Sequence, residues 1–246
     1  MKIGLVYTST TPELISVVEN EVKKQIGEEA ELISREDPTI LADIREAGYV
    51  TAAPAARLVK LYMDVVEEGA DAVLNLCSSV GEAADAVQDL ARYLGVPIVR
   101  VDEEMCREAV RLGRKIAIMA TLPTTMEPTR NTVLRVAREM GKHVELVEVL
   151  IDGGFGLDQE QFKELMARKA KEVADAVDVL LFAQGSMAYC EEYIAGLYQK
   201  PVLSSPRFGA AALKAALIGK GLCGSDTSWK EGSCRREDGR NGEVQS

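Results

Sequence analysis

Short apolar runs alternate with longer amphipathic stretches along most of the chain. Within each run the apolar residues follow one another with no polar residue between them, for example at Val73-Leu74 and Val179-Leu180-Leu181. Such runs are typical of strands that are covered on both faces of a sheet. In the longer stretches, apolar residues recur every three or four positions, which is the spacing of one helix face. The pattern predicts an α/β fold in which helices connect parallel strands.

Predicted strands and helices follow one another in strict alternation. Strands are predicted at residues 3–7, 31–34, 72–76, 98–101, 116–120, 144–150, 179–183 and 202–204. Helices are predicted at residues 12–25, 55–68, 82–94, 104–112, 127–140, 159–176, 191–198 and 209–217. Because parallel strands need crossover connections, a helix after every strand favours parallel sheets.

Two segments of the chain are repeated. Residues 71–80 read D-A-V-L-N-L-C-S-S-V and residues 178–187 read D-V-L-L-F-A-Q-G-S-M, while K-I-G-L-V-Y-T at 2–8 matches K-I-A-I-M-A-T at 115–121. The repeats predict two similar parallel-sheet α/β lobes related by a pseudo-two-fold axis. We expect residues 1–101 to form the first lobe, residues 102–203 the second, and residues 204–222 to return to the first. Residues 223–246 lack apolar periodicity, which predicts a disordered tail.

Composition and charge narrow the class of protein. The 246-residue chain has a formal net charge of −10, which argues against nucleic acid as a partner, since nucleic acid needs clustered basic surface. No apolar stretch approaches the roughly 20 residues of a membrane helix, and the N-terminal apolar run is too short for a signal peptide. We therefore expect a cytoplasmic protein with no membrane partner. Five cysteines without close paired spacing, and a single histidine, favour reduced thiols and no metal site.

Cys77 lies where a predicted buried strand gives way to a turn and a helix. Ligands of parallel sheets collect at the carboxyl ends of strands, and a nearby helix N-terminus can lower the pKa of a thiol. The resulting thiolate can abstract a proton from carbon or attack a carbonyl. The alternative is a structural cysteine that packs as a small hydrophobe. Ser78 and Ser79, which follow directly, and the repeat favour the catalytic interpretation.

Hydroxyl side chains follow the first strand and its repeat partner. Thr8 and Ser9 stand after one strand, and Thr121 and Thr125 after the other. Hydroxyls and free N–H groups at strand ends can bind a carboxylate. Helix capping by Thr11 and Thr125 is the alternative. We favour ligand binding because the clusters occur at both matching positions.

The second repeat ends in Gln184, Gly185 and Ser186. Gln184 stands where the first copy has Cys77, and its amide can donate and accept hydrogen bonds but cannot act as a general base. Gly185 permits either close approach of a ligand or a tight turn. Cys190 lies one helical turn beyond Ser186, and a core-facing position is favoured over a place in a pocket.

Two α/β repeats with Cys-Ser-Ser at 77–79 and Gln-Gly-Ser-Met at 184–187 resemble the aspartate/glutamate/hydantoin racemase superfamily over roughly residues 1–220. The resemblance implies a cofactor-independent enzyme that holds its substrate between the two lobes. In the racemases, one cysteine from each lobe flanks the α-carbon, and one thiolate removes the α-proton while the opposite thiol delivers one. Cys77 matches the first of these cysteines, and Gln184 occupies the place of the second.

We therefore expect an isomerase of the amino-acid racemase or epimerase type, with Cys77 as the catalytic residue. The expected substrate-binding residues are Thr8, Ser9, Ser78, Ser79, Thr121, Thr125, Gln184, Gly185 and Ser186. The expected partner is a small carboxylate or amino-acid-like substrate, no cofactor is expected, and assembly into a homo-oligomer is open. One rival is a single-thiol decarboxylase or hydrolase, and another is a non-catalytic protein that binds a small ligand.

Overall fold

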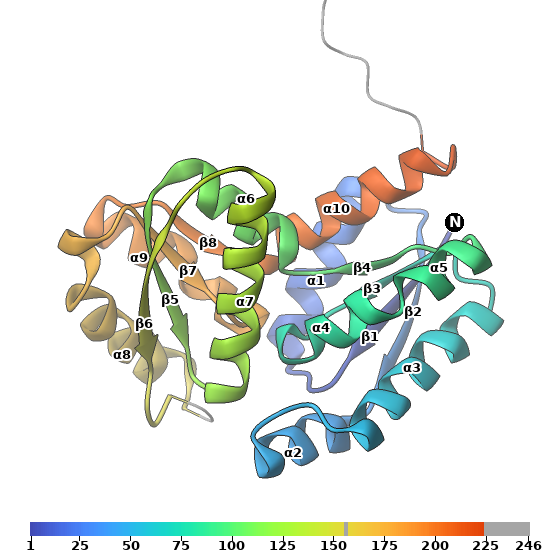
Figure 1. The fold of residues 1–246 in the computed structure, drawn as a ribbon, viewed down its shortest axis with the longest axis horizontal. Helices are drawn as coiled ribbons and strands as arrows, with labels where there is room; N and C mark the ends of the chain where they lie inside the picture. Colours follow the sequence, from blue (N-terminus) through green and yellow to red (C-terminus); the bar gives the residue numbers. More distant parts are fainter. Residues whose placement is uncertain (155–156, 224–246) are drawn as a thin grey trace, which may run out of the picture.

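Two four-stranded parallel sheets lie side by side in the computed structural model, which describes residues 1–154 and 157–223 (Figure 1). The first sheet has the order β2-β1-β3-β4, formed by Lys2–Tyr7 (β1), Glu31–Glu36 (β2), Ala72–Asn75 (β3) and Ile98–Arg100 (β4). The second has the order β6-β5-β7-β8, formed by Lys115–Ala120 (β5), Glu145–Leu150 (β6), Val179–Phe182 (β7) and Val202–Ser204 (β8). The predicted α/β fold with two similar lobes is confirmed. The predicted tail lies outside the described residues, apart from Cys223.

Equivalent strands of the two lobes end at equivalent places. Leu5 of β1 pairs with Leu74 of β3, and Ile118 of β5 pairs with Leu181 of β7. Cys77 and Gln184 each stand two positions beyond the last residue of their strand. The sequence repeat therefore places these two side chains at matching ends of two central strands.

Most helices agree with the predicted positions. The first lobe's sequence contains Pro12–Ile26 (α1), Pro38–Ala47 (α2), Ala52–Glu67 (α3), Ser78–Val80 (η1, a 3₁₀ turn), Gly81–Ala86 (α4) and Gln88–Leu94 (α5). The remainder contains Glu103–Leu112 (α6), Pro123–Glu139 (α7), Gln159–Lys171 (α8), Ala174–Ala176 (η2), Gly185–Cys190 (η3), Glu191–Tyr198 (α9) and Ser205–Gly219 (α10). The helix predicted at 82–94 is divided at Val87, and the one predicted at 159–176 ends at Lys171 with a separate 3₁₀ turn after it.

Helix α2 was not predicted. Asp37 caps it by accepting a hydrogen bond from the Thr39 N–H at 2.9 Å, and Pro38 occupies its first turn. Both are ordinary start signals. The helix buries only Ile40 and Ile44, so its apolar periodicity is too short to identify it.

Two helices cross from one lobe to the other. Helix α6 follows β4 of the first sheet but contributes Met105 and Ala109 to the core around the second sheet. Helix α10 follows β8 of the second sheet and contributes Leu213 and Leu217 to the core around β1 and β3. A Cβ atom on Gly209 would lie 2.8 Å from the Val101 Cα, so α10 passes the first lobe where no side chain fits. The crossings make each core depend on a helix that follows the other sheet.

Among the helices that the structure describes, none combines the length and the hydropathy required to cross a membrane.

Candidate active site

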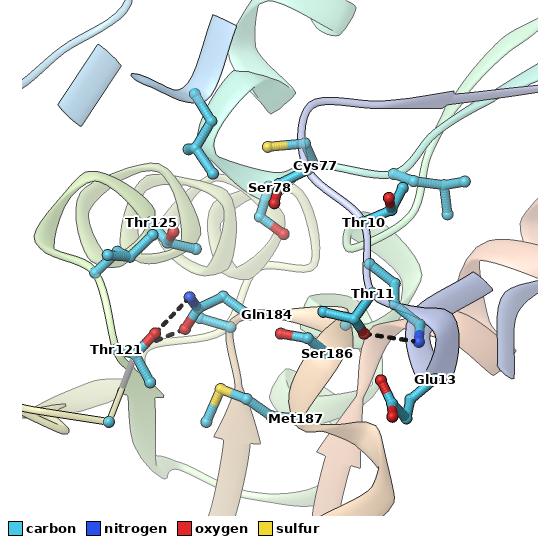
Figure 2. A pocket seen from close by; sticks show the side chains of 18 of the residues that line it. Thr10, Thr11, Glu13, Cys77, Ser78, Thr121, Thr125, Gln184, Ser186 and Met187 are labelled. Atoms are coloured by element: carbon cyan, nitrogen blue, oxygen red, sulfur yellow. Dashed lines mark hydrogen bonds between the residues drawn. The ribbon is translucent and has the colours of Figure 1, made fainter. Parts of the chain in front are cut away.

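A cavity of about 580 Å³ lies between the lobes, at the carboxyl ends of the central strands. Figure 2 shows residues from both lobes around it. All the residues expected to form a site line this one cavity: Cys77, Thr8, Ser9, Ser78, Ser79, Thr121, Thr125, Gln184, Gly185 and Ser186. The structure thus brings together residues that are more than a hundred positions apart in the sequence.

Cys77 joins β3 to the 3₁₀ turn η1, and its side chain is half-buried in the cavity wall. The amide of the buried Asn75 donates a hydrogen bond to the Cys77 carbonyl at 3.0 Å. The buried Tyr62 hydroxyl donates in turn to the Asn75 side-chain oxygen at 3.1 Å. Because satisfied buried polar groups fix local conformation, this chain of hydrogen bonds holds the loop that presents the thiol.

Burial raises the pKa of the Cys77 thiol above its ordinary value. Hydrogen bonds from the Thr8 hydroxyl and from the N–H groups of Ser79 and Val80 act in the opposite direction. Desolvation of the thiolate outweighs these donors, so the net shift of the pKa is opposite to the lowering that a nearby helix N-terminus can cause. Burial thus favours the protonated thiol, while these donors favour the thiolate.

The loop that follows Cys77 is bonded to the second lobe. The hydroxyls of Ser79 and Thr125 lie 2.9 Å apart, and both residues are buried. Helix α7 begins at Pro123, and the preceding Leu122 makes no side-chain cap, so the capping interpretation of Thr125 is wrong. Capping by Thr11 is confirmed, because its hydroxyl accepts from the Leu14 N–H at 3.2 Å.

Gln184 is held inside the second lobe by two hydrogen bonds to one residue (Figure 2). Its Oε1 accepts from the Thr121 N–H at 2.8 Å, and its Nε2 donates to the Thr121 Oγ1 at 2.7 Å. Since the Thr121 hydroxyl oxygen accepts this bond, its own proton is available to another acceptor. The amide therefore fixes Thr121 as a hydrogen-bond donor at the wall of the cavity.

Gly185 lies where the second lobe meets α1. A Cβ atom on it would lie 3.1 Å from Leu14 Cδ1 and 3.4 Å from Ser205 Oγ. Close packing of protein segments thus accounts for this glycine, whose backbone is not in the left-handed region. Ser186 lies between Gln184 and Thr11 in the view of Figure 2.

Sequence reasoning missed part of the cavity wall. These residues come from α1, from α2, from α8 with its N-cap residue, and from η3: Glu13, Leu41, Asp158, Gln159, Phe162, Met187 and Tyr189. Leu41 belongs to the helix that was not predicted, and Phe162 lies in a helix whose periodicity indicated only packing. No motif relates these positions to Cys77 along the chain, so only the tertiary fold assigns them to the cavity.

Cys190 is fully buried in the apolar core of the second lobe and does not line the cavity. Burial raises the pKa of its thiol to about 11. It therefore does not supply the thiol that Gln184 replaces. Within the described residues, no group of three or more His, Cys, Asp or Glu side chains is placed to hold a metal ion.

A comparison with models of protein families identifies one family. The family described as Asp/Glu/Hydantoin racemase matches residues 3–213. A search of curated protein sequences gave no significant match.

Solved structures share the fold at low sequence identity. Glutamate racemase isoform RacE1 from Bacillus anthracis is 16% identical, with a TM-score of 0.68 over 89% of this chain and 82% of its own. Allantoin racemase from Klebsiella pneumoniae is 19% identical, with a TM-score of 0.61 over 93% of this chain and 91% of its own. An unliganded arylmalonate decarboxylase is 15% identical, with a TM-score of 0.58 over 89% of this chain and 93% of its own.

Proposed function

The chain belongs to the Asp/Glu/hydantoin racemase family, and we propose that it is a cofactor-independent isomerase that uses Cys77 to transfer a proton at a carbon beside a carboxylate. The substrate is a small carboxylate or amino-acid-like molecule. One observation supports this most directly: Cys77 is half-buried in a cavity whose other walls present hydroxyl groups from both lobes.

In the proposed step the Cys77 thiol first loses its proton to solvent, and the Thr8 hydroxyl and the N–H groups of Ser79 and Val80 stabilise the thiolate. The substrate C–H bond breaks, an S–H bond forms, and the electron pair moves onto the carboxylate as an enolate. Hydroxyl donors fixed before the reaction stabilise such charge without reorganisation, and Thr121 is fixed in this way by Gln184. Return of that proton from sulfur to carbon restores the substrate. Inversion instead requires a proton from water at the opposite face of the enolate, after which the Cys77 thiol gives its proton to the hydroxide left behind.

A single thiol has a distinct consequence. Gln184 cannot deliver a proton at neutral pH, so a proton returned by Cys77 reaches the face from which it was taken. Because the S–H proton exchanges with solvent before it returns to carbon, the proposal predicts exchange of the substrate Cα–H with solvent deuterium, with exchange faster than inversion of configuration.

The test is proton NMR of racemic norvaline in D₂O with the wild-type protein and two variants. Cys77→Ala is expected to reduce exchange to the background rate, because it removes the only proposed base. Cys223→Ala is the matched control, since Cys223 is a free cysteine that does not line the cavity, and its exchange rate is expected to be unchanged. Full exchange activity in Cys77→Ala would refute the assignment.

Decarboxylation is the second candidate, and the raised pKa of the Cys77 thiol favours it. A thiol that is protonated at rest is suited to donate a proton. In this reaction the bond between carbon and a carboxylate breaks, CO₂ leaves, and the retained electron pair accepts the Cys77 proton. Water then reprotonates the thiolate. The structural similarity to an arylmalonate decarboxylase suggests phenylmalonate as the probe, and release of CO₂ without Cα–H exchange of norvaline would select this candidate.

A further inference from the structure

The described part of the cavity wall is anionic at one end and contains no positive side chain. Its ionisable groups include two carboxylates, Glu13 and Asp158, and no Lys, Arg or His lines it. The strand-end region around Cys77 instead presents hydroxyls and backbone N–H groups. The two ends of the cavity therefore offer different chemistry to a bound molecule.

The carboxylates of Asp158 and Glu13 accept hydrogen bonds from different groups. Asp158 caps α8, and its Oδ1 accepts from the N–H groups of Glu160 at 3.1 Å and Gln161 at 3.0 Å. Glu13 lies in the first turn of α1 and forms no ion pair with any residue that the structure describes. Hydrogen bonds from its own backbone N–H, from the Thr11 hydroxyl and from the Gln159 amide lower its pKa, so the carboxylate is charged at neutral pH.

The carboxylates of Glu13 and Asp158 both act on the Tyr189 phenol. Burial raises the pKa of this phenol, its neighbour Cys190 adds to the shift, and Glu13 and Asp158 both raise it further. The nearby cation is Lys163, whose Nζ lies 6.0 Å from the centre of the Tyr189 ring. Lys163 pairs with Glu160 at 2.9 Å and does not line the cavity, so it does not neutralise this end.

Apolar side chains also line the cavity. They come from α1, from α2, from the loop before α8 and from α8 itself: Leu14, Leu41, Leu157 and Phe162. In Figure 2 Glu13 lies well apart from Cys77, beyond Thr11. A substrate whose carboxylate lies beside the thiol therefore reaches Glu13 only with an extended chain.

We propose that the reacting carboxylate of the substrate lies at the strand ends near Cys77 and that the extension toward Glu13 is apolar or positively charged, so that the site rejects substrates with a second carboxylate at the end of this extension. This rests on the proposed function for the placement of the reacting carboxylate. A second carboxylate would be repelled by Glu13 and would meet no cation in the described wall. Such repulsion acts through solvent at an exposed position and weakens as salt is added.

The test is the dissociation constant of three racemic amino acids with the same chain length, measured by calorimetry at low ionic strength. Norvaline has a neutral end, ornithine a cationic end and glutamate an anionic end. The wild-type protein is expected to bind norvaline and ornithine at least about fivefold more tightly than glutamate. Glu13→Gln is expected to abolish most of this preference, and the matched control Glu21→Gln, on the same helix and outside the cavity, is expected to retain it.

Three outcomes would overturn the inference: equal or tighter binding of glutamate, an unchanged preference in Glu13→Gln, or no binding of any of the three. If the proposed function is wrong but the inference about the substrate is right, the experiments give a different set of results. In that case Cα–H exchange would be absent or would persist in Cys77→Ala, while the order of the three dissociation constants would stay as expected.

Discussion

The ends of β3 and β7 have the same place in their lobes and opposite chemistry. At the first, a loop held by Asn75 presents the half-buried thiol of Cys77 to the cavity. At the second, the Gln184 amide uses its oxygen and its nitrogen on Thr121. The duplicated fold thus preserves the position of the backbone without preserving reactivity. One lobe supplies a group that can transfer a proton, and the other supplies a fixed hydrogen-bond donor.

Under the proposed function, a single thiol acts in a cavity formed by two similar lobes. A second acid or base facing Cys77 would allow a proton to leave one face and enter the other. A bonded amide does not allow this, so the two faces of a bound carbon become unequal. The asymmetry is therefore a property of two side chains and not of the sheets that present them.

A substitution that places glutamine at the ends of both β3 and β7 is expected to have the largest effect. Cys77→Gln removes the thiol and is expected to slow Cα–H exchange of norvaline by at least about a hundredfold, which is the lower range of general acid–base catalysis. Proton NMR in D₂O measures the rate. Cys223→Gln, the same substitution outside the cavity, serves as the control. If Cys77→Gln and Cys223→Gln exchange at equal rates, the difference between the lobes has no catalytic meaning.

The second prediction concerns the dependence of one lobe on a helix that follows the other. Leu213 on α10 is fully buried in the first lobe's core, so Leu213→Ala is expected to lower the free energy of unfolding by about 2–5 kcal/mol. Urea denaturation measures this. Leu222→Ala is the control, since Leu222 is 45% exposed, and a change within about 0.5 kcal/mol is expected. Similar values for the two variants would show that α10 contributes little to the core.

The third prediction tests the fixed amide. Gln184→Leu leaves the Thr121 N–H without its acceptor and is expected to cost about 1–3 kcal/mol of stability. Gln184→Glu keeps an acceptor for that N–H, so its cost at neutral pH is expected to be smaller. Thermal and urea unfolding of both variants measure the difference. Equal stability of Gln184→Leu and wild type would mean that the two hydrogen bonds do not hold this strand end.

The fourth prediction uses pH to separate two thiols. Because burial raises the pKa of Cys77, its alkylation rate by iodoacetamide is expected to rise with pH beyond the point at which an ordinary thiol, with a pKa of about 8.5, is already ionised. Mass spectrometry of the peptide containing Cys77 measures its profile, and a short unstructured cysteine peptide in the same sample supplies the profile of an ordinary thiol. A Cys77 profile with the lower midpoint would contradict the raised pKa.

The raised pKa of Cys77 also makes the stability of the folded protein depend on pH. The folded state retains the Cys77 proton to higher pH than the unfolded chain does. This contribution to stability is therefore complete below the unfolded pKa and is lost as pH rises above it. Cys77→Ala is expected to flatten the alkaline part of the stability profile.

The sequence predicted the strands well because they are runs of apolar residues that both faces of a sheet require. Each predicted strand has a counterpart in the structure. The ends of α7 and α10 were less predictable, since Thr124 and Ser205 are polar and gave no apolar signal at helix starts that begin with a proline turn. The local apolar pattern predicts which residues are buried, but it predicts the ends of helices poorly.

The cavity was predicted only where the repeat indicated it. Cys77 and Gln184 could be identified because two copies of one motif can be compared position by position. Glu13 and Phe162 could not, because they belong to helices without a counterpart in that comparison. The direction of the Cys77 pKa shift depends on how deeply the tertiary fold buries the sulfur, which no local motif records.

The crossing of α10 has a consequence for protein synthesis. The first lobe's strands leave the ribosome early, yet Leu213 and Leu217, which complete the apolar core around β1 and β3, are translated after the whole second sheet. Until they emerge, the nascent first lobe exposes that apolar surface, and such surface invites aggregation. The earliest-made half of this protein therefore matures last, and chaperones that bind nascent chains have a defined interval in which to protect it.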